Sequence, residues 1–506
     1  MAKRALLFLG AACAAVIWGL FALAESMDGL SVSTAHVGQI PITIFRSRAL
    51  ETSPVVVIAH GFAGSQQLMQ PFAITLARNG YIAVTFDFAG HGRNPQPLTG
   101  GLSDMAMSTR ALLTEIGEVT DFAIALPGAD GRLALLGHSM ASDLVVQYAM
   151  NHPGVSAVVA LSLFGQGVTP NNPKNLIVID GAWESSALTA AGFRIVSDAA
   201  KGNAQESVTY GELSQGSGRR LVLASGSEHI GVLYNHDALR EALEWLDASF
   251  GRKGSGFVDS RGKWLALLFT GLIALARPAS RLLPRVAPSP LGAGLPWRRL
   301  LPICIAPALL TPLLLWKAPT GFLPILLGDY LVVHFAVYGL LTGAGLWLTP
   351  LPARRPVAAK ADIARIGLAA SAVAAFYIVA LGLPLDAYVT SFALTGVRWL
   401  LAPAMFAGAA LYFVADEWLT RGLPAVRGGY AFSKTCFVIS LGIAVCLNPQ
   451  RLFFLVIIVP VIILLFAVYG LVSRWVYART NDPRVGALGA ACGLAYAIAV
   501  TFPIVG

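Results

Sequence analysis

The chain has 506 residues, of which 56% are hydrophobic and only 12% are charged, whereas a soluble globule carries about 25% charged residues. This composition excludes an ordinary soluble domain and predicts a membrane protein. The net charge of +9 is unevenly distributed: residues 25–262 hold 15 basic and 21 acidic side chains, and residues 263–506 hold 19 basic and 6 acidic ones. Because the basic excess lies in the apolar half, it argues against nucleic-acid binding.

Residues 1–24 predict a membrane anchor. Lys3 and Arg4 precede an apolar run over residues 5–24, which is about one bilayer span. Ala22-Leu23-Ala24 is also similar to a signal-peptide cleavage site, but we expect a retained helix. In both cases the two basic residues stay in the cytoplasm and residue 25 onward is exported.

Residues 25–262 alternate between predicted strands and helices, and one α/β domain fits this length. Strands are expected over residues 40–45, 54–59, 81–88, 133–136, 155–163, 175–179 and 220–224, and helices up to Arg78 and over 104–125, 143–150 and 239–250. Alternating strands and helices predict a mostly parallel sheet with helices on both faces.

Residues 263–506 predict an all-α transmembrane domain of about eight helices, so that the whole chain has nine spans. The spans are expected near 263–280, 300–317, 320–348, 366–385, 390–414, 430–447, 452–472 and 485–504. Fifteen basic residues fall in alternate loops and only three on the opposite side, and basic loops are cytoplasmic. We therefore expect a bacterial inner-membrane protein whose 25–262 domain lies on the periplasmic face, with the N-terminus in the cytoplasm.

Gly137-His138-Ser139-Met140-Ala141 lies between a predicted strand and a predicted helix. Strand, tight turn with a central serine, then helix is the layout of a nucleophile elbow. The turn is strained and needs small residues two positions before and two after the serine. Gly137 and Ala141 meet this need, although alanine departs from the commonest form, which has a second glycine.

Two more motifs follow predicted strands: His60-Gly61-Phe62-Ala63-Gly64, and Asp87-Phe-Ala-Gly90-His91-Gly92. Together with the elbow they resemble the α/β-hydrolase superfamily of esterases, lipases and serine aminopeptidases, over about residues 40–250. The resemblance implies that the backbone N–H groups of Phe62 and Met140 form an oxyanion hole around an intermediate bound to Ser139.

A serine nucleophile needs a histidine base and an acid that orients the base. His229 directly follows the last predicted strand, whereas His60 and His91 lie in early loops that they are expected to shape. The acid has two candidates, Glu184 and Asp180. Spacing from Gly181 favours Glu184, and the strand end itself favours Asp180.

The chain order of serine, acid and histidine is the α/β-hydrolase one. It predicts a membrane-anchored serine hydrolase that cleaves an ester-like bond of a small-molecule or lipid-like acyl substrate through an acyl-enzyme. The alternatives are an acyltransferase acting on a cell-envelope component, and a membrane transporter or sensor whose hydrolase-like domain only binds a ligand. No cofactor is expected.

Asp416-Glu417-Trp-Leu-Thr-Arg421 resembles a motif of intramembrane CAAX-type proteases. Those enzymes need metal-binding histidines downstream, and no histidine follows His334. The motif therefore predicts a local ion pair at a cytoplasmic helix end. The five cysteines all lie in apolar segments and predict neither a disulfide framework nor a metal site.

Overall fold

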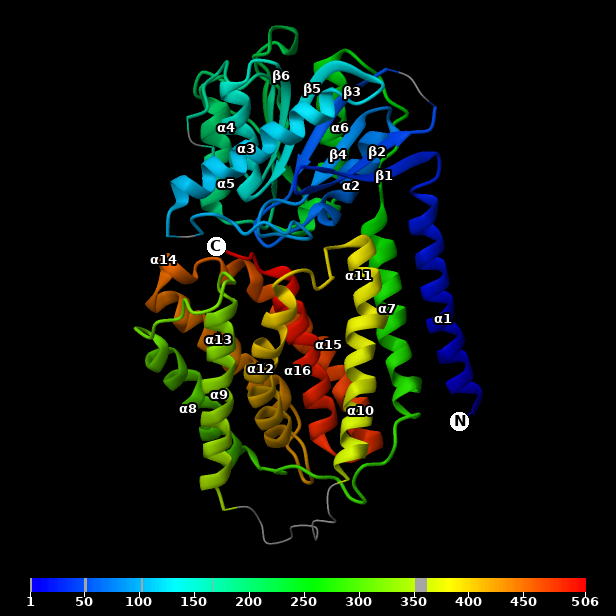
Figure 1. The fold of residues 1–506 in the computed structure, drawn as a ribbon, viewed down its shortest axis with the longest axis vertical. Coiled ribbons are helices and arrows are strands. Elements are labelled where there is room, and N and C mark those ends of the chain that lie inside the picture. Colours follow the sequence, from blue (N-terminus) through cyan, green and yellow to red (C-terminus); the bar gives the residue numbers. More distant parts are fainter. Residues whose placement is uncertain (1, 50–51, 102, 166, 351–361) are drawn as a thin grey trace. The chain divides into compact units, whose positions relative to one another are not determined.

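A computed structural model describes residues 2–49, 52–101, 103–165, 167–350 and 362–506. The chain forms two compact units (Figure 1). The sheet unit comprises Ile17–Leu268, Leu385–Ala393 and Pro503–Gly506, and the helical unit comprises Met1–Val16, Phe269–Pro384 and Leu394–Phe502. Arg354, Arg355 and Lys360, which belong to one of the predicted basic loops, lie outside the described residues.

The sheet unit contains eight strands in the order β1-β2-β4-β3-β5-β6-β7-β8. They are β1 (Leu30–Val37), β2 (Ile40–Ser47), β3 (Ser53–Ala59), β4 (Ile82–Phe86), β5 (Ala129–His138), β6 (Val155–Leu161), β7 (Leu176–Gly181) and β8 (Arg219–Ala224). Strand β2 runs antiparallel to β1 and β4, and all other neighbours are parallel. The predicted mostly parallel sheet is confirmed.

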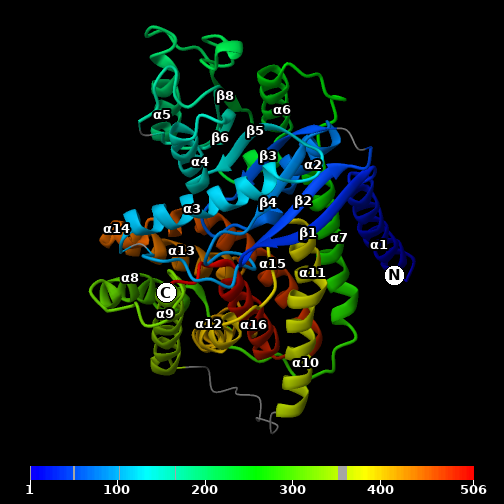
Figure 2. The same cartoon turned by 45° about the horizontal axis from the view of Figure 1, so that its top comes forward.

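Helices cover both faces of this sheet (Figure 2). Along β3, Val55 and Val57 pack into one hydrophobic core, and Val56 and Ile58 into the other, because successive side chains of a strand point to opposite faces. Helices α3 (Met105–Ile124), α4 (Met140–Asn151) and α5 (Ser186–Ser197) cover the first face, and α2 (Gln70–Arg78) and α6 (His236–Phe250) the second. Two covered faces explain why β3 is apolar and buried from Pro54 to Ala59.

Two elements of this unit are absent from the sequence prediction. Strand β1 is a largely exposed edge strand with many polar residues, and it joins β2 through a turn in which Gly38 has a φ of 57°. Helix α5 is rich in small residues, and its buried residues, which include Leu188, Ile195 and Val196, recur at the spacing of a helix face. At Gly192 a Cβ would lie 3.0 Å from Oδ2 of Asp180, so glycine lets α5 approach β7 closely.

The remaining elements are helical. They are α1 (Ala2–Glu25), α7 (Arg261–Ser280), α8 (Trp297–Leu315), α9 (Gly328–Leu348), α10 (Ile363–Ala375), a π-helical turn (Phe376–Leu381), α11 (Gly382–Tyr388), α12 (Arg398–Thr420), α13 (Gly429–Leu447), α14 (Pro449–Leu452), α15 (Leu455–Thr480) and α16 (Pro483–Thr501). Among the described residues, eight helices are long and apolar enough to cross a membrane. The ninth predicted span corresponds to α7, which is not one of these eight helices. The apolar run of α7 is bounded by Lys263 and Arg277.

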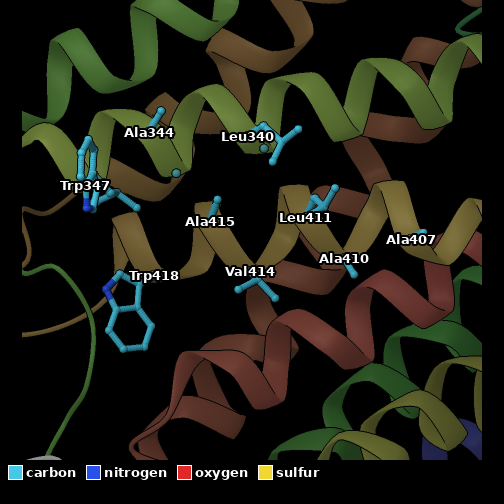
Figure 3. Close-up of a pocket in the computed structure, with 12 residues that line it drawn as sticks. Leu340, Ala344, Trp347, Ala407, Ala410, Leu411, Val414, Ala415 and Trp418 are labelled. Carbon is cyan, nitrogen blue, oxygen red and sulfur yellow. The ribbon is translucent and has the colours of Figure 1, made fainter.

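Within the helical unit, α9 and α12 pack closely against each other at two glycines. A Cβ on Gly339 would lie 2.5 Å from the backbone of Leu411, and one on Gly408 would lie 2.3 Å from the carbonyl oxygen of Val332. The two helices also border an apolar groove of about 640 Å³ that is lined in part by Gly339 and Leu411, and Figure 3 shows Trp347 and Trp418 at the same end of it. Glycine at the crossing thus sets how closely the two helices pack.

The predicted ion pair at the end of α12 is present. Nε of Arg421 lies 2.8 Å from a carboxylate oxygen of Glu417, one helical turn away. Asp416 instead pairs with Lys434 of α13, at 2.6 Å. The motif therefore serves local charge pairing within the helical unit.

Candidate active site

Ser139 lies in the turn between β5 and α4, with φ 56° and ψ −123°. A non-glycine residue rarely adopts a positive φ, and such strain is concentrated at functional sites. A Cβ on Gly137 would lie 2.4 Å from the carbonyl oxygen of Ala141, so position 137 requires glycine. The side chain of Ala141 is itself fully buried without such a conflict, which explains why alanine can replace the second glycine of the motif.

The structure brings Ser139, His229 and Glu184 together from three loops at the ends of β5, β7 and β8. Nε2 of His229 lies 2.9 Å from Oγ of Ser139, and Nδ1 of His229 lies 2.5 Å from Oε1 of Glu184. With Nδ1 protonated, the imidazole donates to the carboxylate and accepts the serine O–H. These residues are 45 and 90 positions apart in the chain, and each pair is within hydrogen-bonding distance.

The carboxylate of Glu184 is held in place from its other side. Oε2 accepts hydrogen bonds from the backbone N–H of Gly181 at 2.6 Å and from the hydroxyl of Ser162 at 3.0 Å. The side chain of Glu184 is only 3% exposed, so these donors and His229 together satisfy a carboxylate that has little access to water. Ser162, which follows β6 and has a φ of 61°, is a site residue that the sequence does not predict.

Asp180, the alternative acid, does not contact His229. Its side chain is buried beside the backbone of Ser162 and Leu163. Burial, and then the negative charge of Glu184, raise the pKa of Asp180 to about 8. At neutral pH this carboxyl is therefore mostly protonated, and it is Glu184 that is hydrogen-bonded to the imidazole.

The loop that carries Phe62 lies against the elbow. A Cβ on Gly61 would be 3.0 Å from the carbonyl oxygen of His138 and 3.0 Å from Cβ of Ser139. Glycine favours this close approach, which brings the next peptide, that of Phe62, close to Ser139. Met140 is the first residue of α4, where backbone N–H groups have no acceptor within the helix.

This geometry agrees with a comparison to known families. Residues 51–181 match the model of the family described as serine aminopeptidase, S33. The sheet unit has the α/β-hydrolase fold. The family match includes the Phe62 loop and the Ser139 elbow but ends before Glu184 and His229, so the site geometry is the observation that joins these two residues to Ser139.

Several solved structures are similar to part of this chain at low identity. A predicted CIB-like hydrolase from Thermoplasma acidophilum has 15% identity and a TM-score of 0.33, covering 43% of this chain and 97% of its own. A putative dienelactone hydrolase from Klebsiella pneumoniae has 17% identity and a TM-score of 0.33, covering 45% and 100%. Est1E from Butyrivibrio proteoclasticus has 15% identity and a TM-score of 0.32, covering 44% and 99%. No curated protein matches the sequence.

Two histidines of the sheet unit support the site without belonging to the Ser139–His229–Glu184 chain. Nε2–H of His138 donates to the carbonyl oxygen of His229 at 2.9 Å, and burial lowers the pKa of His138 to about 3. Nδ1–H of His60 donates to the carbonyl of Gly61 at 2.8 Å, and its Nε2 accepts the N–H of Phe88 at 3.2 Å. Burial also lowers the pKa of His60. Both rings stay neutral at physiological pH and hold the loops around Ser139.

The site thus offers a hydroxyl, an imidazole and a carboxylate in line, which can perform nucleophilic attack and proton transfer. Within the described ranges, no group of three or more His, Cys, Asp or Glu side chains is arranged to hold a metal ion.

Proposed function

We propose that the protein is a membrane-anchored serine hydrolase that cleaves an ester-like acyl bond. The observation that carries this proposal is the continuous hydrogen-bond chain from Ser139 through His229 to Glu184, with links of 2.9 and 2.5 Å. A histidine bonded to both a serine and a carboxylate is the arrangement that activates a serine nucleophile.

In this mechanism Oγ of Ser139 attacks the acyl carbon while Nε2 of His229 takes the hydroxyl proton. Glu184 keeps the Nδ1–H tautomer and stabilises the imidazolium that forms. The backbone N–H groups of Phe62 and Met140 donate to the oxyanion of the tetrahedral intermediate. His229 then protonates the leaving group, and a water molecule, deprotonated by His229, hydrolyses the acyl-enzyme.

Two exposed aromatic side chains support an apolar acyl substrate. Trp183 precedes Glu184 and is 71% exposed, and Phe164 lies two residues after Ser162 and is 52% exposed. Exposed aromatic side chains in these two loops offer apolar surface that an acyl chain can contact. We therefore favour a lipid-like acyl compound as the substrate.

The orientation proposed for the protein places the hydrolase domain on the outer face of a cytoplasmic membrane, with Lys3 and Arg4 inside. Helices α1 and α7 pack in antiparallel fashion, because a Cβ on Gly19 would meet Leu268 and one on Gly271 would meet Ala12 and Val16. Since α1 is apolar enough to span a membrane, an antiparallel partner beside it supports α7 as a return span.

The loop charges support the same orientation. Nine spans put the main segment of the sheet unit, the turn Leu385–Ala393 and Pro503–Gly506 all on the side opposite the basic loops. The count of loop charges is independent of the fold, yet it assigns all three segments of this compact unit to the same side of the membrane. This agreement argues for the proposed arrangement of the spans.

The direct test is labelling by a fluorophosphonate probe and hydrolysis of p-nitrophenyl butyrate by the full-length protein in detergent. We expect a pre-steady-state burst of p-nitrophenol and covalent labelling, both abolished by Ser139→Ala. Ser225→Ala, an exposed serine between β8 and His229, is the matched control and should behave as the wild type. A Ser139→Ala protein that keeps the wild-type rate would exclude the proposed mechanism.

A further inference from the structure

The loop that carries the proposed oxyanion donor Phe62 is hydrogen-bonded to a segment more than three hundred residues away. Ser65, which is 1% exposed, accepts the backbone N–H of Ser391 at 2.8 Å through its Oγ, and the same Oγ lies 3.1 Å from the hydroxyl of Thr390. Both partners belong to Leu385–Ala393, the segment between α11 and α12 that is part of the sheet unit.

A second contact from this segment reaches the neighbouring loop. Asp386 forms an ion pair with Arg93, with Oδ2 and Nη2 2.5 Å apart, and its Oδ1 accepts the N–H of Phe392 at 2.8 Å. Asp386 therefore closes its own turn and binds Arg93 with the same carboxylate. In addition, Nε2 of Gln70 donates to the carbonyl of Ala387 at 3.1 Å.

The two loops are themselves joined by Asp87. Its buried carboxylate accepts the backbone N–H of Gln66 at 2.7 Å and that of Arg93 at 3.0 Å. The contacts thus form a closed circuit that runs from Ser65 and Gln66 through Asp87 and Arg93 to Asp386, and through Leu385–Ala393 back to Ser65. A closed circuit restrains each loop more than single contacts do, because no member can shift without breaking a bond elsewhere.

The loop that carries Phe62 needs such a restraint. Ala63 has a φ of 55° although it is not glycine, which is an unfavourable backbone conformation that the surroundings must maintain. An oxyanion donor acts only if it is fixed at the position where charge develops, and removing one donor costs about 10²–10³-fold in kcat. A loop that relaxes by a fraction of an ångström therefore loses rate without losing substrate binding.

On this basis, which rests on the proposed hydrolase function, we infer that Ser65, Arg93 and Asp386 are positioning residues. Through them the segment Leu385–Ala393, which is contiguous in sequence with two candidate membrane-spanning helices, holds the Phe62 loop in its catalytically competent conformation. The groups touch neither the substrate nor the reacting atoms, and they act on kcat through the oxyanion donor.

The test uses the full-length protein in detergent, with rates normalised by active-site titration so that unfolded protein does not count. Asp386→Asn removes the ion pair while keeping the shape of the side chain, and Ser65→Ala removes the acceptor for Ser391. We expect kcat for p-nitrophenyl butyrate to fall about tenfold with KM within about twofold, short of the loss of a whole donor. The matched control is Asp130→Asn. This variant breaks an ion pair of 2.6 Å with Arg132 that is comparably exposed and lies elsewhere in the same unit, so kcat should not change.

A second readout separates positioning from general loosening. A trifluoromethyl ketone forms a tetrahedral adduct with an active serine, and its Ki should rise in Ser65→Ala and Asp386→Asn by the factor by which kcat/KM falls. Arg93→Lys, which keeps a cation beside Asp386, should retain more activity than Arg93→Gln. Unchanged kcat and Ki in Ser65→Ala and Asp386→Asn, with Ser139→Ala inactive, would overturn the positioning role alone, whereas an active Ser139→Ala would overturn the hydrolase function itself.

Discussion

Replacement of Glu184 by glutamine isolates the role of the carboxylate from its shape. In the wild type, Oε2 accepts from Gly181 N–H and Ser162 O–H, and Oε1 faces Nδ1 of His229. A glutamine must direct its single oxygen toward the two donors, since leaving them unpaired costs about 1–3 kcal/mol each. Its NH₂ group then faces Nδ1, so the imidazole must carry its proton on Nε2, where it can no longer accept the proton of Ser139.

The wrong tautomer in a serine triad lowers kcat by about 10⁴-fold, which corresponds to about 5.5 kcal/mol of barrier. We expect this loss for Glu184→Gln in p-nitrophenyl butyrate hydrolysis, with KM little changed. Asp180→Asn is the matched control: Asp180 does not touch His229 and is mostly neutral at pH 7, so its rate should stay within about threefold of the wild type. A larger loss in Asp180→Asn than in Glu184→Gln would refute this assignment of the acid.

Three further predictions follow from the same geometry. Gly137→Ala should destabilise the sheet unit by about 1–3 kcal/mol, because the new Cβ would meet the carbonyl of Ala141. Gly154→Ala, where a Cβ meets nothing within 4 Å, is the control and should unfold at the wild-type temperature. Equal melting temperatures for the two variants would contradict this prediction. The pKa of Asp180 is raised from 3.8 to about 8 in the folded protein, so between these pH values the folded state keeps a proton that the unfolded chain has lost. The melting temperature should therefore decline as pH rises from about 4 to about 8, and it should decline less in Asp180→Asn. The same dependence of melting temperature on pH in both proteins would count against this prediction. His138→Phe leaves the carbonyl of His229 without its hydrogen-bond donor. This change should lower kcat about fivefold, which is the equivalent of one hydrogen bond of about 1 kcal/mol. The shape of the pH–rate profile should not change, because burial lowers the pKa of His138 to about 3.

The sheet and the positions of Ser139 and His229 are predictable because their signals are local. Each of these two side chains lies in the turn or loop after a strand, and the C-terminal ends of parallel strands meet at one edge of a sheet. The apolar runs around Val55–Ala59 and Leu133–Leu136 mark central strands covered on both faces. The elbow glycine and the histidine after the last strand can therefore be assigned without coordinates.

Other parts of the site have no such signal. Strand β1 carries several polar residues and is largely exposed, so it lacks the apolar run that marks the central strands. The choice between Glu184 and Asp180 depends on side-chain direction after a turn, and spacing alone leaves both open. Ser162 is one serine among many, and only the fold shows that its hydroxyl reaches Glu184.

The segments that complete the sheet unit are the least predictable feature, and they change how the helical half is understood. Besides Leu385–Ala393, the segment Pro503–Gly506 pairs with the loop after Asp87: Leu98 donates to the carbonyl of Ile504 at 2.8 Å, and Ile504 donates to that of Gly90 at 2.9 Å. A Cβ on Gly90 would lie 2.5 Å from the same carbonyl of Ile504, so this contact requires glycine at that position. Hydrogen bonds between residues about four hundred positions apart leave no periodicity or motif in the sequence. If the C-terminal half served only as an anchor, its loops would need no specific bonds to the loops around Ser139. The presence of two such sets, one at Ser65 and Arg93 and the other at Gly90 and Leu98, argues that these two C-terminal segments also hold the loops to which they are bonded.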